Sequence, residues 1–519
     1  MRLKIATMAV LLAGLQWFAG CNASAGTSDD RGPQEIPWPT KSWLVSTPEE
    51  QGMESGSLAR LIDNVGGYKQ DSLLIVRHGR IVADVYYAPY IAHISHDLRS
   101  VTKSVVGTLT AIQLKKGNLA SVDDPVMDLF SDKPIQHADD RKKAITVQHL
   151  LDMTSGIEWF ERLYSPDETL MKMYQSPDRT GFVLNQPMAG VPGASFNYAG
   201  GNPYLLSALI NRKSGQTAFD FAKKELFEPL GIKSAKWGTV DAQGVTNGEA
   251  GLFLSPHDMA RIGYLYLHNG MWDGNQIIPS SWVERSKAGP VAATFGFRYA
   301  NLWWSLPEKG AYMARGRHSQ LILVLPKLDI VAVMTGVLRD DEFYSASRLI
   351  NEIANSVKSD APLPPDPIAK SLLAASIRHA ATERPSAVGS TPELAKAISG
   401  KTLQFDTNEL RIKTFTLNFF DSDSSWVITT ESGRPDRSTD RFTGLMGLDG
   451  VFRKSPPAMY GINAAKGRWL NEHTFVLERR ILGRGETQAW AFAFDGNMVT
   501  LKFENTDGTT AELRGEVRD

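Results

Sequence analysis

The sequence predicts an α+β domain, in which helices flank an antiparallel sheet, followed by a small all-β domain. Three observations support this fold class: two apolar runs around an early turn, helical periodicity through the middle of the chain, and short apolar runs from residue 299 onward. Because 519 residues exceed what one ordinary hydrophobic core accommodates, two globular units are expected.

The first predicted element is a β-hairpin. Apolar runs at 72–77 and 80–87 lie on either side of His78-Gly79, a turn sequence. A helix is predicted over 101–116, because its apolar residues recur at helical spacing and Gly117 follows a basic last turn.

Further helices begin at capping residues. Thr146 precedes an apolar stretch, and Ser255 precedes Pro256, which is favoured at the first helical position.

From Tyr299 the apolar residues come in short runs separated by Pro, Gly and Asp. The runs at 302–304, 311–313, 321–325 and 330–334 predict an antiparallel meander. Since the hairpin and the meander stand at opposite ends of the domain, the sheet is expected to be completed by segments far apart in the sequence.

The chain divides into five predicted segments. Residues 1–21 form a signal peptide, 22–40 a tether, 41–360 the first domain, 361–391 a linker with a short helix, and 392–519 a β-rich domain built as a barrel or sandwich.

The N-terminus predicts export. A basic start, an apolar stretch and the sequence Phe18-Ala19-Gly20-Cys21 resemble the signal and lipobox of a bacterial lipoprotein, in which Cys21 is lipidated. The protein is then expected at the periplasmic face of a bacterial membrane, held only by its lipid anchor. The alternative is an ordinary signal peptide, with Cys21 removed or left as a thiol. With one cysteine, no intramolecular disulfide is expected.

Composition and charge argue against several classes of protein. Hydrophobic residues at 42% and charged residues at 22% are ordinary for a folded protein. Because 56 basic side chains balance 57 acidic ones, a nucleic-acid partner is not expected. No spacing indicates a zinc site or a dinucleotide or phosphate loop, so no metal or cofactor is expected.

Ser100 and Lys103 lie three residues apart at the start of the helix predicted over 101–116, so both side chains project from one face. A serine hydroxyl becomes a strong nucleophile when a neighbouring base takes its proton, and a lysine can be that base. The pair alone also fits an ordinary solvated helix start.

Further motifs along the chain favour the interpretation of Ser100 and Lys103 as a catalytic pair over that of an ordinary helix start. They are HDLRSVTKS at 96–104, TVQHLLDMTSG at 146–156, Pro192-Gly193 before Phe196-Asn197-Tyr198, and GLFLSPHDMAR at 251–261. With these motifs, residues 45–355 resemble the β-lactamase-like serine hydrolases, which include class C β-lactamases, D-aminopeptidases, esterases and 6-aminohexanoate-dimer hydrolases. The resemblance implies a β-lactamase/transpeptidase-like fold, with Ser100 as nucleophile, Lys103 as its partner, and Tyr198 as the second catalytic hydroxyl.

Two family elements are altered. The family's Tyr-x-Asn is here Tyr198-Ala199-Gly200, with Asn202 displaced as a candidate for substrate binding. This departure favours the esterase or amidase branches over β-lactamase activity.

The third family element, often Lys-Thr-Gly, has its nearest counterpart at 315–320. We expect Gly316 to allow another part of the site to approach its backbone closely. His318 is expected at the edge of the site, and the alternative is that it is a turn residue on the surface. An oxyanion hole is expected from the backbone N–H of Ser100 and that of Ser319 or Gln320.

The function expected from these residues is acyl transfer through Ser100 onto an ester or amide substrate. The alternative is a non-catalytic or very slow penicillin-binding or cell-wall sensor protein. The substrate, whether β-lactam, D-amino peptide, linear amide or ester, and the oligomeric state stay open.

Overall fold

The computed structural model describes residues 37–161, 167–238, 240–339, 345–388, 390–420, 424–433, 438–458 and 461–519. The predicted signal peptide, Cys21 and most of the tether lie outside the described residues. Within the described ranges, no helix combines the length and apolarity needed to span a membrane.

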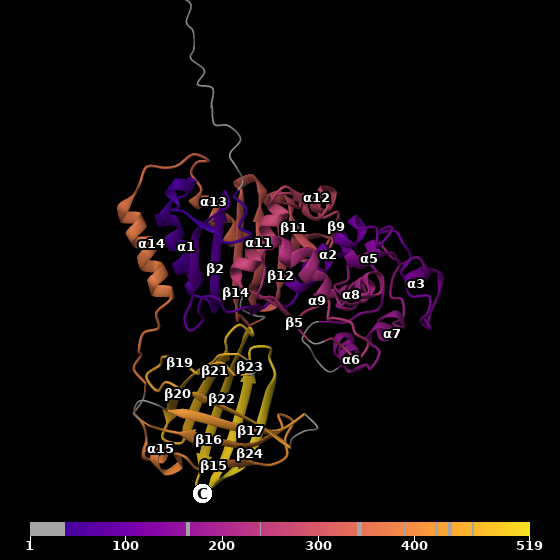
Figure 1. The fold of residues 1–519 in the computed structure, drawn as a ribbon. Coiled ribbons are helices and arrows are strands. Elements are labelled where there is room, and N and C mark those ends of the chain that lie inside the picture. The colour runs from indigo at the N-terminus through magenta and orange to yellow at the C-terminus, as the bar shows by residue number, and fades with distance from the viewer. Residues whose placement is uncertain are drawn as a thin grey trace, which may run out of the picture. The chain divides into compact units, whose positions relative to one another are not determined.

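A nine-stranded sheet forms the centre of the first domain (Figure 1). Its strands, in spatial order, are β1 (Leu44–Val45), β3 (Arg80–Tyr86), β2 (Gln70–Arg77), β14 (Ile330–Gly336), β13 (Gln320–Leu325), β12 (Ala311–Gly316), β11 (Trp303–Leu306), β10 (Arg298–Ala300) and β9 (Val291–Ala292). The predicted hairpin is β2–β3 and the predicted meander runs through β11–β14. Antiparallel pairing of β2 with β14 joins the two ends of the domain, so this expectation is confirmed.

Alternate residues of the sheet face two different hydrophobic clusters, because successive side chains of a strand point to opposite faces. In β14, Ile330, Ala332 and Met334 belong to one cluster, while Val331 and Val333 belong to the other. Near-continuous apolar strands of this kind are typical of a sheet covered on both faces.

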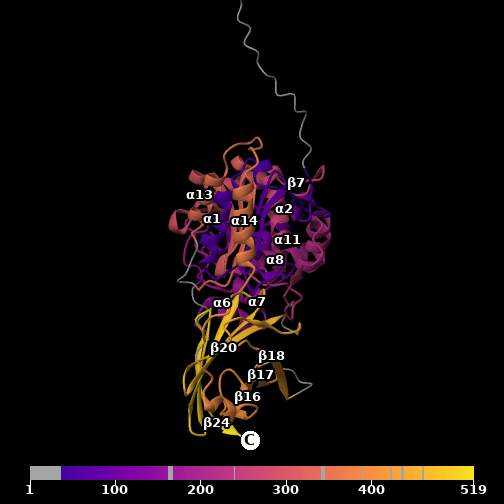
Figure 2. The same ribbon diagram turned by 90° about the vertical axis from the view of Figure 1, so that its left-hand side faces the viewer.

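Helices cover each face of the sheet. One face packs against α1 (Ser55–Gly66), α13 (Ala346–Ser356) and α14 (Pro367–Ala380), and Figure 2 shows α14 lying alongside α1. The other face packs against α2 (Val101–Lys115), α11 (Pro256–Leu267) and α12 (Ser280–Ala288), and α8 (Gly201–Ser214) packs against α2. The helix expected within the linker is α14, and its Leu373 packs into the same cluster as α1.

Shorter elements complete the first domain. The short helices are α3 (Val126–Leu129), α4 (Asp140–Lys143), α5 (Val147–Leu151), α6 (Thr169–Gln175), α7 (Arg179–Leu184), α9 (Ala218–Ala222) and α10 (Glu228–Leu230). Two small sheets contain β4 (His96–Asp97), β6 (Leu252–Leu254) and β5 (Lys236–Trp237), and β7 (Met271–Trp272) with β8 (Asn275–Gln276). Thr146 and Ser255 cap α5 and α11, as their sequences predict.

The C-terminal domain is a ten-stranded antiparallel near-barrel preceded by α15 (Glu393–Ile398). Its strands are β15 (Thr402–Phe405), β16 (Ile412–Asn418), β17 (Ser425–Glu431), β18 (Thr439–Leu445), β19 (Arg453–Lys454), β20 (Asn463–Asn471), β21 (Thr474–Ile481), β22 (Glu486–Asp495), β23 (Met498–Asn505) and β24 (Thr510–Arg518). Gly447, just after β18, bonds across to β20, because its N–H donates to the Ala465 carbonyl at 3.1 Å and its carbonyl accepts from Gly467 at 2.8 Å. The predicted all-β domain is therefore confirmed.

Candidate active site

Ser100 lies at the junction between the short strand β4 and helix α2. Arg99, directly before it, has a left-handed backbone with φ of +49°, and its N–H donates to Asp97 Oδ1 at 3.0 Å. A left-handed backbone in a non-glycine residue is strained, and such strain recurs at functional sites. This turn redirects the chain from strand to helix and places Ser100 at the N-cap of α2.

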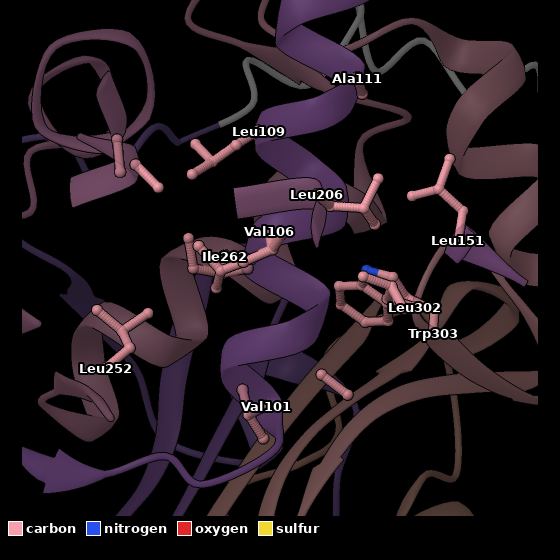
Figure 3. Close-up of a cluster of buried hydrophobic side chains, with 14 of the residues drawn as sticks. Val101, Val106, Leu109, Ala111, Leu151, Leu206, Leu252, Ile262, Leu302 and Trp303 are labelled. Carbon is pink, nitrogen blue, oxygen red and sulfur yellow. The ribbon is translucent and has the colours of Figure 1, made fainter. Parts of the chain in front are cut away.

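Helix α2 is enclosed by the core, because every residue from 101 to 113 is buried. Figure 3 shows Val101, Val106 and Leu109 of α2 among side chains that include Leu206 and Ile262. Lys103, in the first turn of the same helix, is 0% exposed. A buried ammonium is costly unless it is paired and hydrogen-bonded, so the partners of Lys103 define the site.

Lys103 Nζ donates three hydrogen bonds to Ser100 and Glu249 within the described part of the chain. It lies 2.8 Å from Ser100 Oγ, 2.9 Å from the Glu249 carbonyl oxygen and 3.0 Å from Glu249 Oε2. These three acceptors match the three N–H donors of an ammonium group. The structure thus brings Ser100 and Lys103 together and adds a carboxylate to the pair.

Two very short strands bring Glu249 to this position. Strand β6 pairs antiparallel with β4, and the Leu98 N–H donates to the Leu252 carbonyl at 2.9 Å. The segment before β6 therefore runs past the first turn of α2. Sequence reasoning did not single out Glu249, although it stands two residues before the motif at 251–261.

A second, partly buried carboxylate, Glu161, faces the same ammonium. Its Oε2 accepts from Trp159 Nε1 at 2.9 Å and from the Gly200 N–H at 2.8 Å. Burial raises the pKa of the Glu161 carboxyl, the positive charge of Lys103 lowers it, and the charge of Glu249 raises it, with a net increase. The site therefore combines one ammonium with two carboxyl groups.

Tyr198 lies beside Lys103, in the loop that leads into α8. The Lys103 Nζ is 4.9 Å from the centroid of the Tyr198 ring, and that ring stacks on Trp304 with centroids 5.9 Å apart. The preceding residue, Asn197, donates its backbone N–H to the Met153 carbonyl at 2.8 Å. Stacking and this backbone bond fix the tyrosine next to the Ser100–Lys103 pair. Trp303, in contrast, is fully buried in the sheet.

The altered Tyr-Ala-Gly element has a local cause. A Cβ at Gly200 would lie 2.9 Å from Glu161 Oε2, so the glutamate carboxylate leaves little room for a side chain at position 200. Asn202, two residues on, lies in the first turn of α8 and is buried. Its Oδ1 accepts from Ser155 Oγ at 3.0 Å, and its amide nitrogen contacts Met153 Sδ at 3.6 Å.

Gly316, at the end of β12, lies against the backbone around Ser100. A Cβ at this position would lie 2.4 Å from the Leu98 carbonyl oxygen and 3.1 Å from the Ser100 nitrogen. Only a residue without a side chain allows this close approach.

The turn after Gly316 carries the other predicted residues. His318 is buried, and its Nδ1 lies 2.7 Å from the Leu338 carbonyl oxygen, so this nitrogen carries the proton. Ser319 Oγ accepts from Gln70 Nε2 at 3.2 Å, and Gln320 Nε2 donates to the Gly336 carbonyl at 2.8 Å. Both His318 and Ser319 have positive φ, which turns the backbone between β12 and β13 near Ser100.

Arg315 in β12 adds a positive charge that sequence reasoning did not assign. Its guanidinium lies 4.6 Å from the Phe297 ring centroid and 5.7 Å from that of Trp304. Burial lowers the pKa of Arg315, whereas the nearby Tyr198 raises it, with a net decrease. Among the described residues, no group of three or more His, Cys, Asp and Glu side chains is arranged to hold a metal ion.

Comparison with known proteins identifies the family. The family model described as Beta-lactamase matches residues 58–353, which is more than half of the chain. The chain therefore belongs to the Beta-lactamase family, whose serine hydrolases act on amides and esters.

Individual relatives are distant. A 6-aminohexanoate-dimer hydrolase of Paenarthrobacter ureafaciens is 25% identical over 285 residues, covering 51% of this chain and 71% of the relative. An uncharacterised protein of Alkalihalophilus pseudofirmus is 24% identical over 305 residues, covering 50% and 82%. The solved structure of EstCE1, a hydrolase with promiscuous acyltransferase activity, superposes with a TM-score of 0.50 at 17% identity, covering 59% of this chain and 99% of its own.

Proposed function

We propose that this chain is a serine hydrolase that cleaves an ester or amide bond through an acyl-enzyme on Ser100. The observation that carries the proposal is the 2.8 Å contact between Lys103 Nζ and Ser100 Oγ, made by a lysine with no exposed surface. A buried amine directed at a hydroxyl at a helix N-terminus is an arrangement that activates a serine nucleophile.

Each residue of the trio has a role in this reaction. Ser100 Oγ attacks the carbonyl carbon while its proton leaves toward Lys103, and Tyr198 passes a proton to the leaving group. Water then hydrolyses the acyl-enzyme. The backbone N–H groups of Ser100 and of Ser319 or Gln320 would bind the developing oxyanion, and one such donor contributes roughly 3 kcal/mol to transition-state stabilisation.

The substrate class is expected to exclude good β-lactams. A carboxylate oxygen of Glu161 lies 2.9 Å from the place of a Cβ at position 200, so a carboxylate stands next to the position from which the family's Tyr-x-Asn supplies its amide. One relative is named for hydrolysis of the 6-aminohexanoate dimer. We therefore expect simple esters and linear amides to turn over faster than a β-lactam.

Mass spectrometry after exposure to a fluorophosphonate probe tests this function. The protein, its Ser100→Ala variant and the control Ser371→Ala are compared, with turnover of p-nitrophenyl acetate and nitrocefin measured beside them. Ser371 is exposed on α14, and its hydroxyl donates to the Pro367 carbonyl. An adduct on Ser100 and ester turnover, both lost only in Ser100→Ala, are expected. Equal behaviour of all three proteins would remove the enzyme proposal.

A second candidate function is a sensor that is acylated but hardly turns over. The missing side chain at Gly200 favours it, because the amide that this family element supplies is absent. The same experiment separates the two candidates: a stoichiometric adduct without sustained ester turnover would indicate the sensor.

A further inference from the structure

More acidic side chains surround Lys103 than the proposed reaction needs. Glu249 faces the ammonium from the segment before β6, and Glu161 faces it from the segment after α5. Two phenols also face it, Tyr198 from the loop before α8 and Tyr299 from β10. Of these groups, Glu249 is the one in direct ion-pair contact with Lys103 Nζ, at 3.0 Å.

The Glu249 carboxylate is held in place on its other side. Its Oε1 accepts a short hydrogen bond from the Tyr174 hydroxyl, and that hydroxyl accepts from Asn247 Nδ2 at 3.2 Å. Glu249 is 1% exposed, so the pair lies away from solvent. A structural lysine could be satisfied by backbone carbonyls alone, as Lys142 is by those of Leu184 and Gln186.

We infer that Glu249 is a positioning residue that sets the protonation state of Lys103, by taking the proton that the lysine must release before it accepts the proton of Ser100. This inference rests on the proposed function, in which Lys103 is the partner of the nucleophile.

The proton transfers balance along a continuous chain of hydrogen bonds. Lys103 Nζ lies between Ser100 Oγ at 2.8 Å and Glu249 Oε2 at 3.0 Å. One N–H bond of Lys103 breaks as an O–H bond forms on Glu249 Oε2. The Oγ–H bond of Ser100 then breaks as a new N–H bond forms, and Oγ bonds to the substrate carbonyl carbon. Lys103 ends as an ammonium, Glu249 as a neutral acid, and the negative charge resides on the oxyanion.

This arrangement predicts a specific effect of pH. With Glu249 present, the proton acceptor is internal, so the acylation rate is expected to change little around neutral pH. In Glu249→Gln the lysine must release its proton to solvent. Loss of the neighbouring negative charge also disfavours the ammonium, so the pKa of Lys103 is expected to fall.

The experiment measures Lys103 directly and the reaction separately. The full chain, with ¹³C-labelled lysine, is titrated by NMR as wild type and as Glu249→Gln, and Lys103→Arg assigns the signal. Rates of Ser100 acylation by p-nitrophenyl acetate, followed by the p-nitrophenol released in the first turnover, are recorded over the same pH range. We expect the Lys103 titration midpoint to fall by about one pH unit or more in Glu249→Gln. The acylation rate of this variant should rise with pH around that midpoint.

Two further variants keep the test specific. Glu249→Asp retains the charge and should retain a pH profile close to that of the wild type. Glu225→Gln removes the partner of Lys116, a partly exposed pair at 2.9 Å, and should change neither measurement.

A Lys103 midpoint that is unchanged in Glu249→Gln would overturn the inference, as would a rate that falls equally at every pH. If the wild type is not acylated but the midpoint still shifts, the proposed function fails while the control of Lys103 by Glu249 is supported.

Discussion

At the scale of single residues, the site depends on side chains whose surroundings decide their chemistry. Lys103 is buried and directed at Ser100, and Tyr198 is held between that lysine and the Trp304 ring. An aromatic ring stacked on one face and adjacent to a cation on the other has little freedom to reorient. The Tyr198 ring is therefore kept at a defined place beside Lys103.

Removal of the Tyr198 hydroxyl tests the role proposed for this residue in the reaction. Tyr198→Phe keeps the ring and its stacking on Trp304 but removes the hydroxyl that we propose carries the proton to the leaving group. We expect kcat for an alkyl ester, whose alkoxide leaving group must be protonated, to fall roughly 10²-fold or more, with an unchanged melting temperature. The control is Tyr68→Phe, which removes a hydroxyl that contacts Arg348 on the surface. Ester hydrolysis that continues unchanged in Tyr198→Phe would exclude the tyrosine from the reaction.

The residues of the site differ in how far the sequence predicts them. Ser100 and Lys103 are one helical turn apart, so local spacing is enough to place them together. Glu249 lies 146 positions from Lys103, and the connection runs through β4 and β6, which are too short to show any periodicity. The approach of Glu161 to Gly200 likewise joins residues far apart in the sequence. No local sequence pattern indicates it.

At the scale of elements, strand β12 and helix α2 meet at Ser100. The sequence predicts both elements, because each is long enough to show its own period. Their contact depends on Gly316, which lets the strand end approach the Leu98 carbonyl and the Ser100 nitrogen. The oxyanion-binding geometry proposed for this site therefore depends on the distance between two secondary-structure elements.

A side chain at Gly316 should separate these elements. In Gly316→Ala the new Cβ would stand 2.4 Å from the Leu98 carbonyl oxygen, so β12 or the Ser100 turn must move. A displacement of this kind commonly costs about 10²-fold in rate. We expect a loss of this size in the fluorophosphonate labelling rate. Gly433→Ala is the matched control, because nothing lies within 4 Å of a Cβ there. Full labelling of Gly316→Ala would show that the close approach is not needed.

At the scale of the whole molecule, residues 37–519 form one unit that is tied together by buried charges. Asp71 in β2 accepts from His96 Nε2 at 2.9 Å and from the guanidinium of Arg480 in β21. In addition, the Asp97 N–H donates to the Gly483 carbonyl at 2.6 Å, and Arg99 pairs with Glu486 at 2.9 Å. Both domains thus contact the segment that leads into Ser100.

The charge of Asp71 should make stability depend on pH. Burial raises the pKa of this carboxyl, but Arg480 and His96 lower it by more, so its pKa is below the ordinary value. The stabilisation it gives is therefore present above the unfolded-state pKa of about 4 and is lost as the pH falls through the lower folded-state value.

Urea unfolding of the wild type and Asp71→Asn tests this contribution. At pH 7 the variant should be less stable by about 3 kcal/mol, because the partners of a buried carboxylate lose their charge compensation. The difference should shrink as the pH is lowered below 4. The control is Asp128→Asn, on the short helix α3. Equal unfolding free energies of wild type and Asp71→Asn at pH 7 would contradict the expectation.

The pairing of β2 with β14 has a consequence for how the chain acquires its fold. The two strands are neighbours in the central sheet, although almost the whole first domain separates them in sequence. Contacts of such high contact order close slowly, because the entropy of a long loop is lost before the pairing is gained. During synthesis the hairpin β2–β3 emerges early, and its apolar inner edge stays unpaired until β14 has left the ribosome. Over that interval the nascent chain presents an unpaired strand edge, a feature that favours aggregation.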